Sequence, residues 1–332
     1  MTIRIGISGW RYPPWRGVFY PRGLPQRREL EFAARCFRSI EINGSFYSLQ
    51  TPASYAAWHD ATPSDFVFSV KGPRYLTHML RLRDVEKPLA NFLASGVLRL
   101  GRKLGPILWQ LPPNMRYEPE RIERFLSRLP TGTGQALAMA RRRDIDRMRG
   151  RSALAIDRDR PLRHAMEARH DSFCDPAFLA QLRRHGVAWV VADTAGKWPY
   201  AEDVTSDFVY IRLHGDTELY ASGYGPEATE RWAQRIRYWA EGGESADATR
   251  IGGPASRRRQ RDVYCYFDND AKVHAPFDAV ALATKLGLPS DEAAPAWAGA
   301  DACGESVART RKTAASRLAA VLIVLAAAAA GN

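Results

Sequence analysis

Short apolar stretches alternate with longer amphipathic stretches along most of this chain. Each short stretch is about five to seven residues long and rich in Val, Ile, Phe or Tyr, which is typical of a strand buried on both faces. The pattern predicts strands at residues 3–8, 39–43, 66–71, 106–111, 163–169, 188–193, 208–214 and 263–268.

The segments between these strands show the periodicity of helices. Helices are predicted at residues 29–37, 52–58, 119–129, 176–185, 228–240 and 276–286. Pro119, Pro176 and Pro276 stand where a first helical residue is expected, a position that tolerates proline. The long connection at 131–160 contains a further helical run, 135–149, which we interpret as an extra helix after the fourth strand.

About eight strand–helix repeats predict a single-domain α/β fold, a TIM-type (β/α)8 barrel, at residues 1–288. A doubly wound open sheet is the alternative, but it usually carries an early glycine-rich phosphate turn that is missing here. Residues 289–332 are predicted to be a poorly ordered, irregular tail: a low-complexity linker and a short apolar segment. That segment, 318–330, is shorter than the ~20 residues that span a bilayer, which leaves contact with a membrane surface as the alternative.

Composition places the chain among ordinary globular proteins, with 45% hydrophobic and 25% charged residues. The net charge of +12 includes arginine runs at 141–143 and 257–259. Such runs can bind a polyanion such as nucleic acid, or they can reflect a general abundance of arginine. Both interpretations stay open.

The four cysteines lie far apart in the sequence, at Cys36, Cys174, Cys265 and Cys303. This spacing indicates reduced thiols and supports neither a disulfide framework nor a structural zinc site. No basic-then-apolar leader precedes the first predicted strand, so we expect a cytoplasmic protein.

Polar residues cluster where the predicted strands end. In a barrel of parallel strands these ends meet at one face, which forms the ligand-binding mouth. Residues two apart in a strand point the same way, so Glu41 with Asn43, and Glu167 with Arg169, each share a face. If their alternates pack against the outer helices, these groups face the barrel interior, where buried charges must pair.

The sequence therefore predicts ion pairs of Glu41 or Glu167 with Arg169 or Arg212. A ligand site is favoured over a purely structural polar layer, because enzymes with this fold use this face. The predicted catalytic residues are Glu41, Glu167, His214 and Lys71, and the predicted substrate-binding residues are Trp10, Tyr12, Asn43, Tyr47, His78, Gln110, Arg169, Asp193, Arg212, Asp268 and Asn269.

No cofactor can be named from the sequence. A divalent metal at the mouth is an alternative that depends only on donor types, since Glu41, Glu167, Asp193, His214 and Asp268 offer oxygen and nitrogen but no short ligand motif.

Seven ordered segments resemble the YecE-like family, also called domain of unknown function 72. They are IGISGW (5–10), EINGSFY (41–47), FSVKGP (68–73), QLPP (110–113), EARH (167–170), RLHG (212–215) and YFDND (266–270). The resemblance covers residues 3–287 and implies a TIM-type barrel without implying a reaction. Asp268 stands where the family often has Asn, which adds a carboxylate near the mouth.

The leading hypothesis is an enzyme that acts on a small polar or anionic substrate, such as a sugar or sugar phosphate. Its acid and base would be Glu41 and Glu167, its proton shuttle His214, and its anion clamps Lys71, Arg169 and Arg212. The alternatives are a nucleic-acid-binding protein or metal-dependent nuclease, and a scaffold without catalysis. Oligomeric state cannot be derived from the sequence.

Overall fold

Eight parallel strands close into a barrel in the computed structural model, which describes residues 1–289. The strands run in chain order, each hydrogen-bonded to its sequence neighbours, and β8 pairs with β1. They are β1 (Ile3–Ser8), β2 (Ser39–Ile42), β3 (Val67–Lys71), β4 (Leu104–Gln110), β5 (His164–Glu167), β6 (Ala188–Asp193), β7 (Phe208–Leu213) and β8 (Asp262–Phe267). The predicted TIM-type (β/α)8 barrel is confirmed, and the open doubly wound sheet is excluded.

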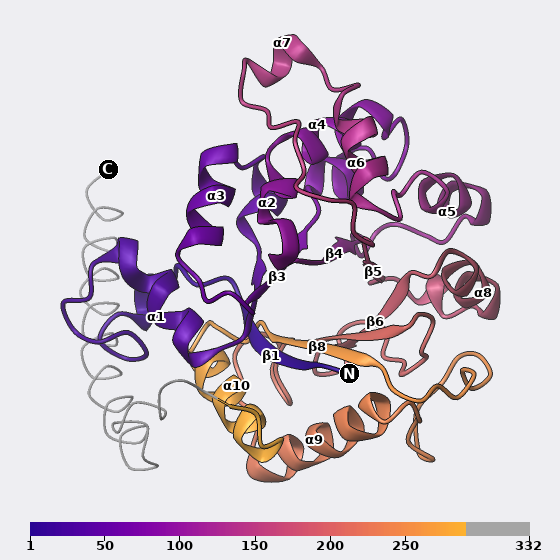
Figure 1. The fold of residues 1–332 in the computed structure, drawn as a ribbon. Helices are drawn as coiled ribbons and strands as arrows, with labels where there is room; N and C mark the ends of the chain where they lie inside the picture. Colours follow the sequence, from indigo (N-terminus) through magenta and orange to yellow (C-terminus); the bar gives the residue numbers. More distant parts are fainter. Residues whose placement is uncertain (290–332) are drawn as a thin grey trace, which may run out of the picture. The chain divides into compact units, whose positions relative to one another are not determined.

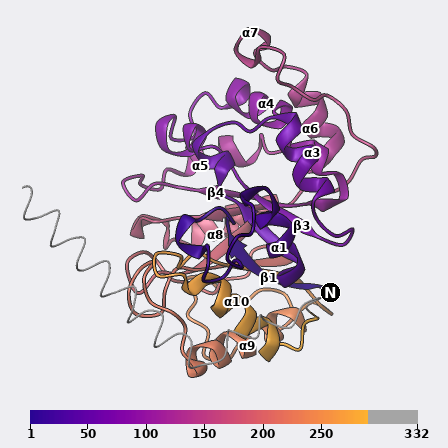
Figure 2. The ribbon, with the colours of Figure 1, turned by 90° about the vertical axis from the view of Figure 1, so that its left-hand side faces the viewer.

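Helices surround the barrel (Figures 1 and 2). The α-helices are α1 (Glu29–Cys36), α2 (Gly44–Tyr47), α3 (Pro52–Asp60), α4 (Glu86–Ala94), α5 (Pro119–Leu126), α6 (Thr133–Ala140), α7 (Ile145–Met148), α8 (Pro176–His185), α9 (Pro226–Ala240) and α10 (His274–Lys285). Shorter helical turns are η1 (Pro13–Trp15), η2 (Gln26–Arg28), η4 (Val97–Lys103) and η5 (Asp171–Phe173), and η3 (Tyr75–Met79) is a π-helix.

Three helix predictions need correction. The run predicted as one extra helix at 135–149 is two helices, α6 and α7, and the second begins at a new N-cap, where Asp144 accepts a hydrogen bond from the Arg147 amide. Helix α10 begins at His274, so Pro276 is its third residue and not its first. Helix α4 was not predicted. The predicted tail lies outside the described residues from 290 onward.

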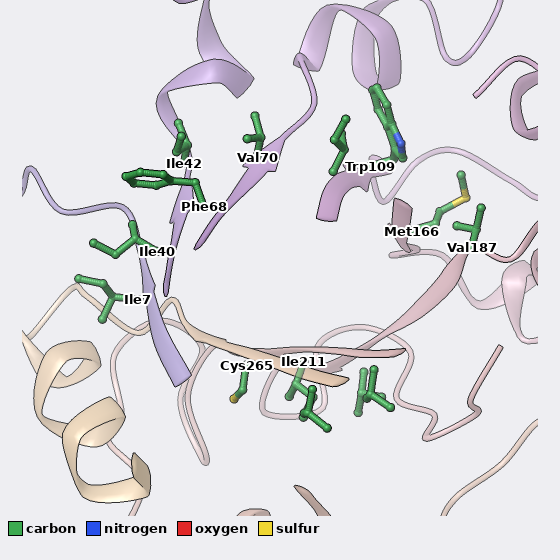
Figure 3. Packing of buried hydrophobic residues seen from close by; sticks show 14 of the residues in the cluster. Ile7, Ile40, Ile42, Phe68, Val70, Trp109, Met166, Val187, Ile211 and Cys265 are labelled. Carbon is green, nitrogen blue, oxygen red and sulfur yellow. The ribbon is translucent and has the colours of Figure 1, made fainter. Parts of the chain in front are cut away.

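Alternation along the strands divides the apolar side chains into two cores. The larger core fills the space between strands and helices, and Figure 3 shows residues such as Ile7, Ile40, Ile211 and Cys265 there. The smaller core lies inside the barrel and is built from Leu108, Ala165, Ala188, Val190, Ala192, Phe208, Tyr210, Tyr264 and Tyr266. This separation sets which polar side chains point into the barrel mouth.

Close contact between β1 and β2 depends on Gly6. A Cβ atom at Gly6 would lie 1.9 Å from the Ser39 carbonyl oxygen, a distance at which the backbone must move. The glycine lets β1 and β2 pair in a register that brings Ser8 next to Glu41.

No helix among residues 1–289 is both long and apolar enough to cross a membrane.

Candidate active site

A buried ion-pair network lies at the C-terminal ends of the strands and is centred on Arg212. Its guanidinium lies 2.9 Å from Glu41 Oε1, 2.8 Å from Glu167 Oε2 and 2.8 Å from Asp268 Oδ2. Arg169 adds a second cation, with its Nε 2.6 Å from Glu167 Oε1. The ion pairs predicted from the sequence are therefore present, although the residues come from four different strands or strand ends.

The alternation of the strands explains this convergence. The residues that flank the charged positions all belong to the core between strands and helices: Ile40, Ile42, Ala168, Ile211 and Leu213. Since neighbouring residues in a strand point to opposite faces, the charged side chains point into the barrel.

Uncharged side chains also donate hydrogen bonds to the carboxylates of Glu41 and Glu167. Tyr210 donates from its hydroxyl to Glu41 Oε2 at 2.6 Å, and Ser8 donates to the other oxygen of Glu41. Gln110 donates from Nε2 to Glu167 Oε1 at 3.1 Å. Carboxylates with this many donors are held in fixed orientations.

The charges around Glu167 and Asp268 hold both side chains in the ionised form. Burial by itself would raise the pKa of Glu167, but the charges of Arg169 and Arg212 outweigh it and hold that pKa well below its ordinary value. Burial is likewise outweighed at Asp268, where the Arg212 charge lowers the pKa of the carboxyl. Neither group is suited to donate a proton near neutral pH.

Lys71, the last residue of β3, differs from the other cations of the mouth. It is buried, with 7% of its surface exposed, yet among residues 1–289 its Nζ has neither an ion pair nor a hydrogen bond. The Nζ lies 4.4 Å from the centre of the Phe46 ring. Burial, followed by the charge of Arg212, lowers the pKa of Lys71 to about 8.

His78 lies within electrostatic range of both Lys71 and Arg169. Burial lowers the pKa of His78 to about 4, and the charges of Lys71 and Arg169 contribute to the shift. The Arg169 guanidinium stacks on Trp198 at 3.7 Å from the ring centre, and only its Nε is hydrogen-bonded within the described residues. Its two terminal nitrogens are thus available to a ligand.

His214 is fully buried beside Arg212. Its Nδ1 lies 3.2 Å from Asp268 Oδ2, but at an angle that leaves Nδ1 without a hydrogen-bond partner among the described residues. Burial and the Arg212 charge lower the pKa of His214, so the imidazole is neutral at neutral pH. Its ring packs edge-on against Tyr220 at 5.3 Å.

Asn43 and Tyr12 border the same network. Asn43 donates from Nδ2 to Ser8 Oγ at 2.8 Å, while its Oδ1 is buried and has no partner within residues 1–289. Tyr12 donates to the Ser8 carbonyl, and burial, followed by the Asp268 charge, raises its pKa well above the ordinary value. A buried amide oxygen without a partner is uncommon and suits a site that receives a ligand.

Four predicted binding residues lie elsewhere. Trp10 belongs to the outer core, 5.3 Å from the Trp58 ring in α3. Asp193 and Asn269 point to the outer face of the barrel, away from the network. Asp193, at the end of β6, accepts from the Tyr224 hydroxyl at 3.1 Å, and Asn269, just after β8, donates to Asp278 at 2.7 Å. Tyr47 is 71% exposed.

Tyr47 instead borders a cavity of about 550 Å³ beside the mouth. The cavity lies between α2, η3, α4 and α7, and its lining includes Phe46, Tyr75 and the basic residues Arg74, Lys87 and Arg147. Phe46 contacts both this cavity and Lys71, so the cavity is next to the network.

The donors predicted for a metal do not come together as a metal site. Among residues 1–289, no group of three or more His, Cys, Asp or Glu side chains is arranged to hold a metal ion. Glu41, Glu167 and Asp268 are paired with Arg212, and Asp193 lies on the other face of its strand.

The two arginine runs lie on different parts of the barrel. Residues 141–143 join α6 to α7, whereas 257–259 lie in the segment between α9 and β8, and the two segments are on opposite sides in Figures 1 and 2. They do not form a single basic surface of the kind that follows a nucleic-acid backbone.

The sequence did not predict the role of Trp198. It stands in the connection between β6 and β7, where no periodicity relates it to the strands, and it contacts Arg169, His214 and Tyr220. Its position after the sixth strand was the only available signal.

Comparison with solved structures supports the fold. A DUF72 family protein from Thermotoga maritima MSB8 superimposes with a TM-score of 0.65 at 23% identity, covering 86% of this chain and 100% of that one. A second DUF72 family protein, from Enterococcus faecalis V583, gives a TM-score of 0.61 at 15% identity, covering 87% of this chain and 96% of that one.

Curated relatives are similar over a shorter length. The UPF0759 protein YecE of Escherichia coli (strain K12) is 30% identical over 129 residues, which is 39% of this chain and 44% of that protein. The UPF0759 protein YunF of Bacillus subtilis (strain 168) is 27% identical over 125 residues, 36% of this chain and 43% of that protein. The matches thus span less than half of each relative.

Residues 4–300 match the family described as "Protein of unknown function DUF72". This match extends over most of the chain and includes every strand of the barrel. The chain therefore belongs to the DUF72 family.

Proposed function

We propose that this protein is an enzyme that acts on a small polar substrate with an anionic group, such as a phosphate or carboxylate, at the mouth of the barrel. The observation that carries the proposal is Lys71, a buried cation without an ion pair or hydrogen bond among the described residues. The cation–π contact with Phe46 offsets only part of the free energy that burial of an ammonium group costs, so a purely structural role is a poor account of it.

The charges of the mouth support an anionic ligand. The carboxylates of Glu41, Glu167 and Asp268 all lie within 3 Å of Arg212, and Glu167 also pairs with Arg169. No carboxylate lies within ion-pair distance of Lys71 in the described part of the chain, so its charge is available to a ligand.

Arg169 supplies a second contact for the same anion. Its terminal nitrogens make no hydrogen bond to any residue that the structure describes, and Trp198 together with Glu167 fixes the guanidinium plane. A guanidinium held in this way offers two parallel donors to a phosphate or carboxylate. Because the charges of Lys71 and Arg169 both lower the pKa of His78, we propose that the anion binds near these three side chains.

The ionic network supports these groups. In this account Glu41 and Glu167 position Arg212 and Arg169, and neutral His214 is the candidate for proton transfer. The remainder of a larger substrate would occupy the cavity on the other side of Phe46. The arginine runs offer no specific observation in favour of nucleic acid, so we do not propose that function.

Calorimetric titration with inorganic phosphate, and then with a panel of sugar phosphates and short carboxylic acids, tests the proposal. The variants are Lys71→Met and Arg169→Met, with Lys285→Met as the control, because Lys285 is a surface residue paired with Glu230. Wild type and control should bind the same ligands, and both mouth variants should lose at least about tenfold in affinity. Absence of binding to wild type, or equal binding to the mouth variants, would overturn the proposal.

A further inference from the structure

We infer that the Lys71 amine forms a Schiff base with an aldehyde or ketone substrate. The inference rests on the proposed anion site, because it assigns that site a substrate class: a carbonyl compound with a phosphate or carboxylate group. The geometry that carries it is an Nζ atom at the end of β3 that faces the mouth, contacts Phe46 and makes no hydrogen bond to any described residue.

The absence of hydrogen-bond acceptors around its Nζ distinguishes Lys71 from Lys103, the other buried lysine of the described chain. The Nζ of Lys103 donates to the carbonyls of His59 and Thr62 and to the Thr62 hydroxyl, so all three of its N–H bonds are used. Lys71 has no such acceptors among residues 1–289. Its pKa of about 8 also leaves roughly a tenth of the molecules with a neutral amine at pH 7.

The reaction balances without an oxidant or reductant. The neutral nitrogen attacks the carbonyl carbon, the C=O π pair moves to oxygen, and one proton passes from nitrogen to that oxygen. A second proton, taken from solvent, converts the hydroxyl of the carbinolamine into water. Water leaves as the C=N bond forms, and hydrolysis of the iminium returns the proton and the free amine.

The surrounding carboxylates favour the product of this step. An iminium has the same positive charge as the lysine ammonium, at the same nitrogen. Asp268, Glu41 and Glu167 each favour positive charge on Lys71, although burial and Arg212 oppose it. The neutral amine is thus accessible for attack, and the carboxylates offset part of the cost of the positive charge that returns to this nitrogen in the iminium.

Arg169 restricts which carbonyl compounds fit. If its guanidinium binds the anionic group, the carbonyl carbon of the same molecule must also reach the Lys71 amine, and both cations act on His78. Short α-keto acids and phosphorylated three-carbon ketones or aldehydes have this arrangement of groups. We therefore choose pyruvate and dihydroxyacetone phosphate as probes.

Reductive trapping tests the inference. The folded full-length protein is incubated with each probe and sodium cyanoborohydride, and the product is examined by intact mass and peptide mapping. Wild type should gain one adduct per chain, on Lys71, with the mass of the probe less one oxygen atom, for at least one of the probes. Lys285→Met should behave in the same way, and inorganic phosphate should slow the trapping.

A second variant separates this inference from the proposed function. Lys71→Arg keeps a cation in the mouth but lacks a nucleophilic amine, so it should bind phosphate and form no adduct at residue 71. Phosphate binding by wild type without an adduct on Lys71 would overturn the Schiff base and leave the anion site standing. An adduct on Lys71 that forms at the same rate with phosphate present, in a protein that does not bind phosphate, would support the Schiff base and overturn the anion site. Adducts spread evenly over surface lysines would overturn the inference.

Discussion

Two buried lysines, in two regions of the barrel, have opposite surroundings. Lys103 is 3% exposed at the end of η4, just before β4 begins, and Lys71 is 7% exposed at the end of β3. The first has three oxygen acceptors, one on His59 near the end of α3 and two on Thr62, just after that helix. The second faces an aromatic ring and has none among the described residues. Burial is therefore common to the two lysines, and the presence or absence of hydrogen-bond acceptors in the described part of the chain is what separates them.

Helix α3 explains the difference. The carbonyls at a helix C-terminus lack intrahelical donors and attract a cation, so Lys103, at the end of η4, donates to the His59 carbonyl at the end of α3 and to the Thr62 carbonyl that follows it. Among residues 1–289, Lys71 donates no hydrogen bond from its Nζ. The cost of its burial is offset in part by the Phe46 ring and by more distant carboxylates, and the remaining cost is what a ligand or a reaction at Lys71 would relieve.

The largest effect in the mouth should come from Arg212→Met. The substitution leaves three buried carboxylates without their shared partner, and we expect a loss of about 3–5 kcal/mol in the free energy of unfolding. Urea denaturation followed by circular dichroism measures it. A loss below about 1 kcal/mol would mean that the network does not hold the mouth together.

Replacing each buried lysine by methionine should change stability in opposite directions. Lys103→Met leaves carbonyls without a donor and should lower the free energy of unfolding by about 1–3 kcal/mol. Lys71→Met removes an unpaired buried charge and should raise it by up to about 3 kcal/mol near pH 7. Denaturant titrations of both variants measure these changes. A large loss of free energy of unfolding in both would remove the contrast between the two lysines on which the proposal depends.

The pH dependence of stability should differ between wild type and Lys71→Met. The pKa of Lys71 is about 8 in the folded protein and about 10.5 in the unfolded chain. Between these values the unfolded chain holds more protons, so the free energy of unfolding of wild type rises with pH relative to the variant. The difference in free energy of unfolding between Lys71→Met and wild type should be constant below pH 8 and should shrink between about pH 8 and 10.5. Denaturant titrations across this range measure it, and parallel curves would contradict the shifted pKa.

The smallest expected effect is on His78. Burial and the charges of Lys71 and Arg169 hold its pKa at about 4, so Lys71→Met should raise that pKa by a fraction of a unit or more. The titration of the His78 ring protons by NMR measures the change. Phosphate bound between the cations should raise the pKa in wild type as well. An unchanged His78 in both experiments would place the anion elsewhere.

The sequence predicted the barrel and the charged centre of the mouth because both follow from alternation. Glu41, Glu167 and Arg212 stand between apolar residues that pack outward, which determines the face of each. Asp193 was expected in the mouth but lies outside it. All the remaining residues of β6 are apolar, so the sequence does not show which alternate residues of this strand point into the barrel. Similarly, nothing in the sequence reports that Trp10 packs on Trp58.

Contacts between distant segments were beyond prediction. Trp198 reaches Arg169 from a connection without regular structure, and Phe46 reaches Lys71 from α2. Sequence identified Lys71 as a candidate but could not show that Arg212, and not Lys71, takes the carboxylates. Helix α4 was missed, although its residues are largely buried in the structure, and α6 and α7 were merged across the turn that Asp144 caps.

Competitive labelling of the lysines with trace acetic anhydride, read by peptide mapping from pH 6 to pH 11, tests the central claim about Lys71 most directly. We expect the Lys71 amine to be labelled and to titrate near pH 8, the surface lysines to titrate near their ordinary value, and Lys103 to resist labelling. A Lys71 that titrates together with the surface lysines, or that stays unlabelled at every pH, would contradict it.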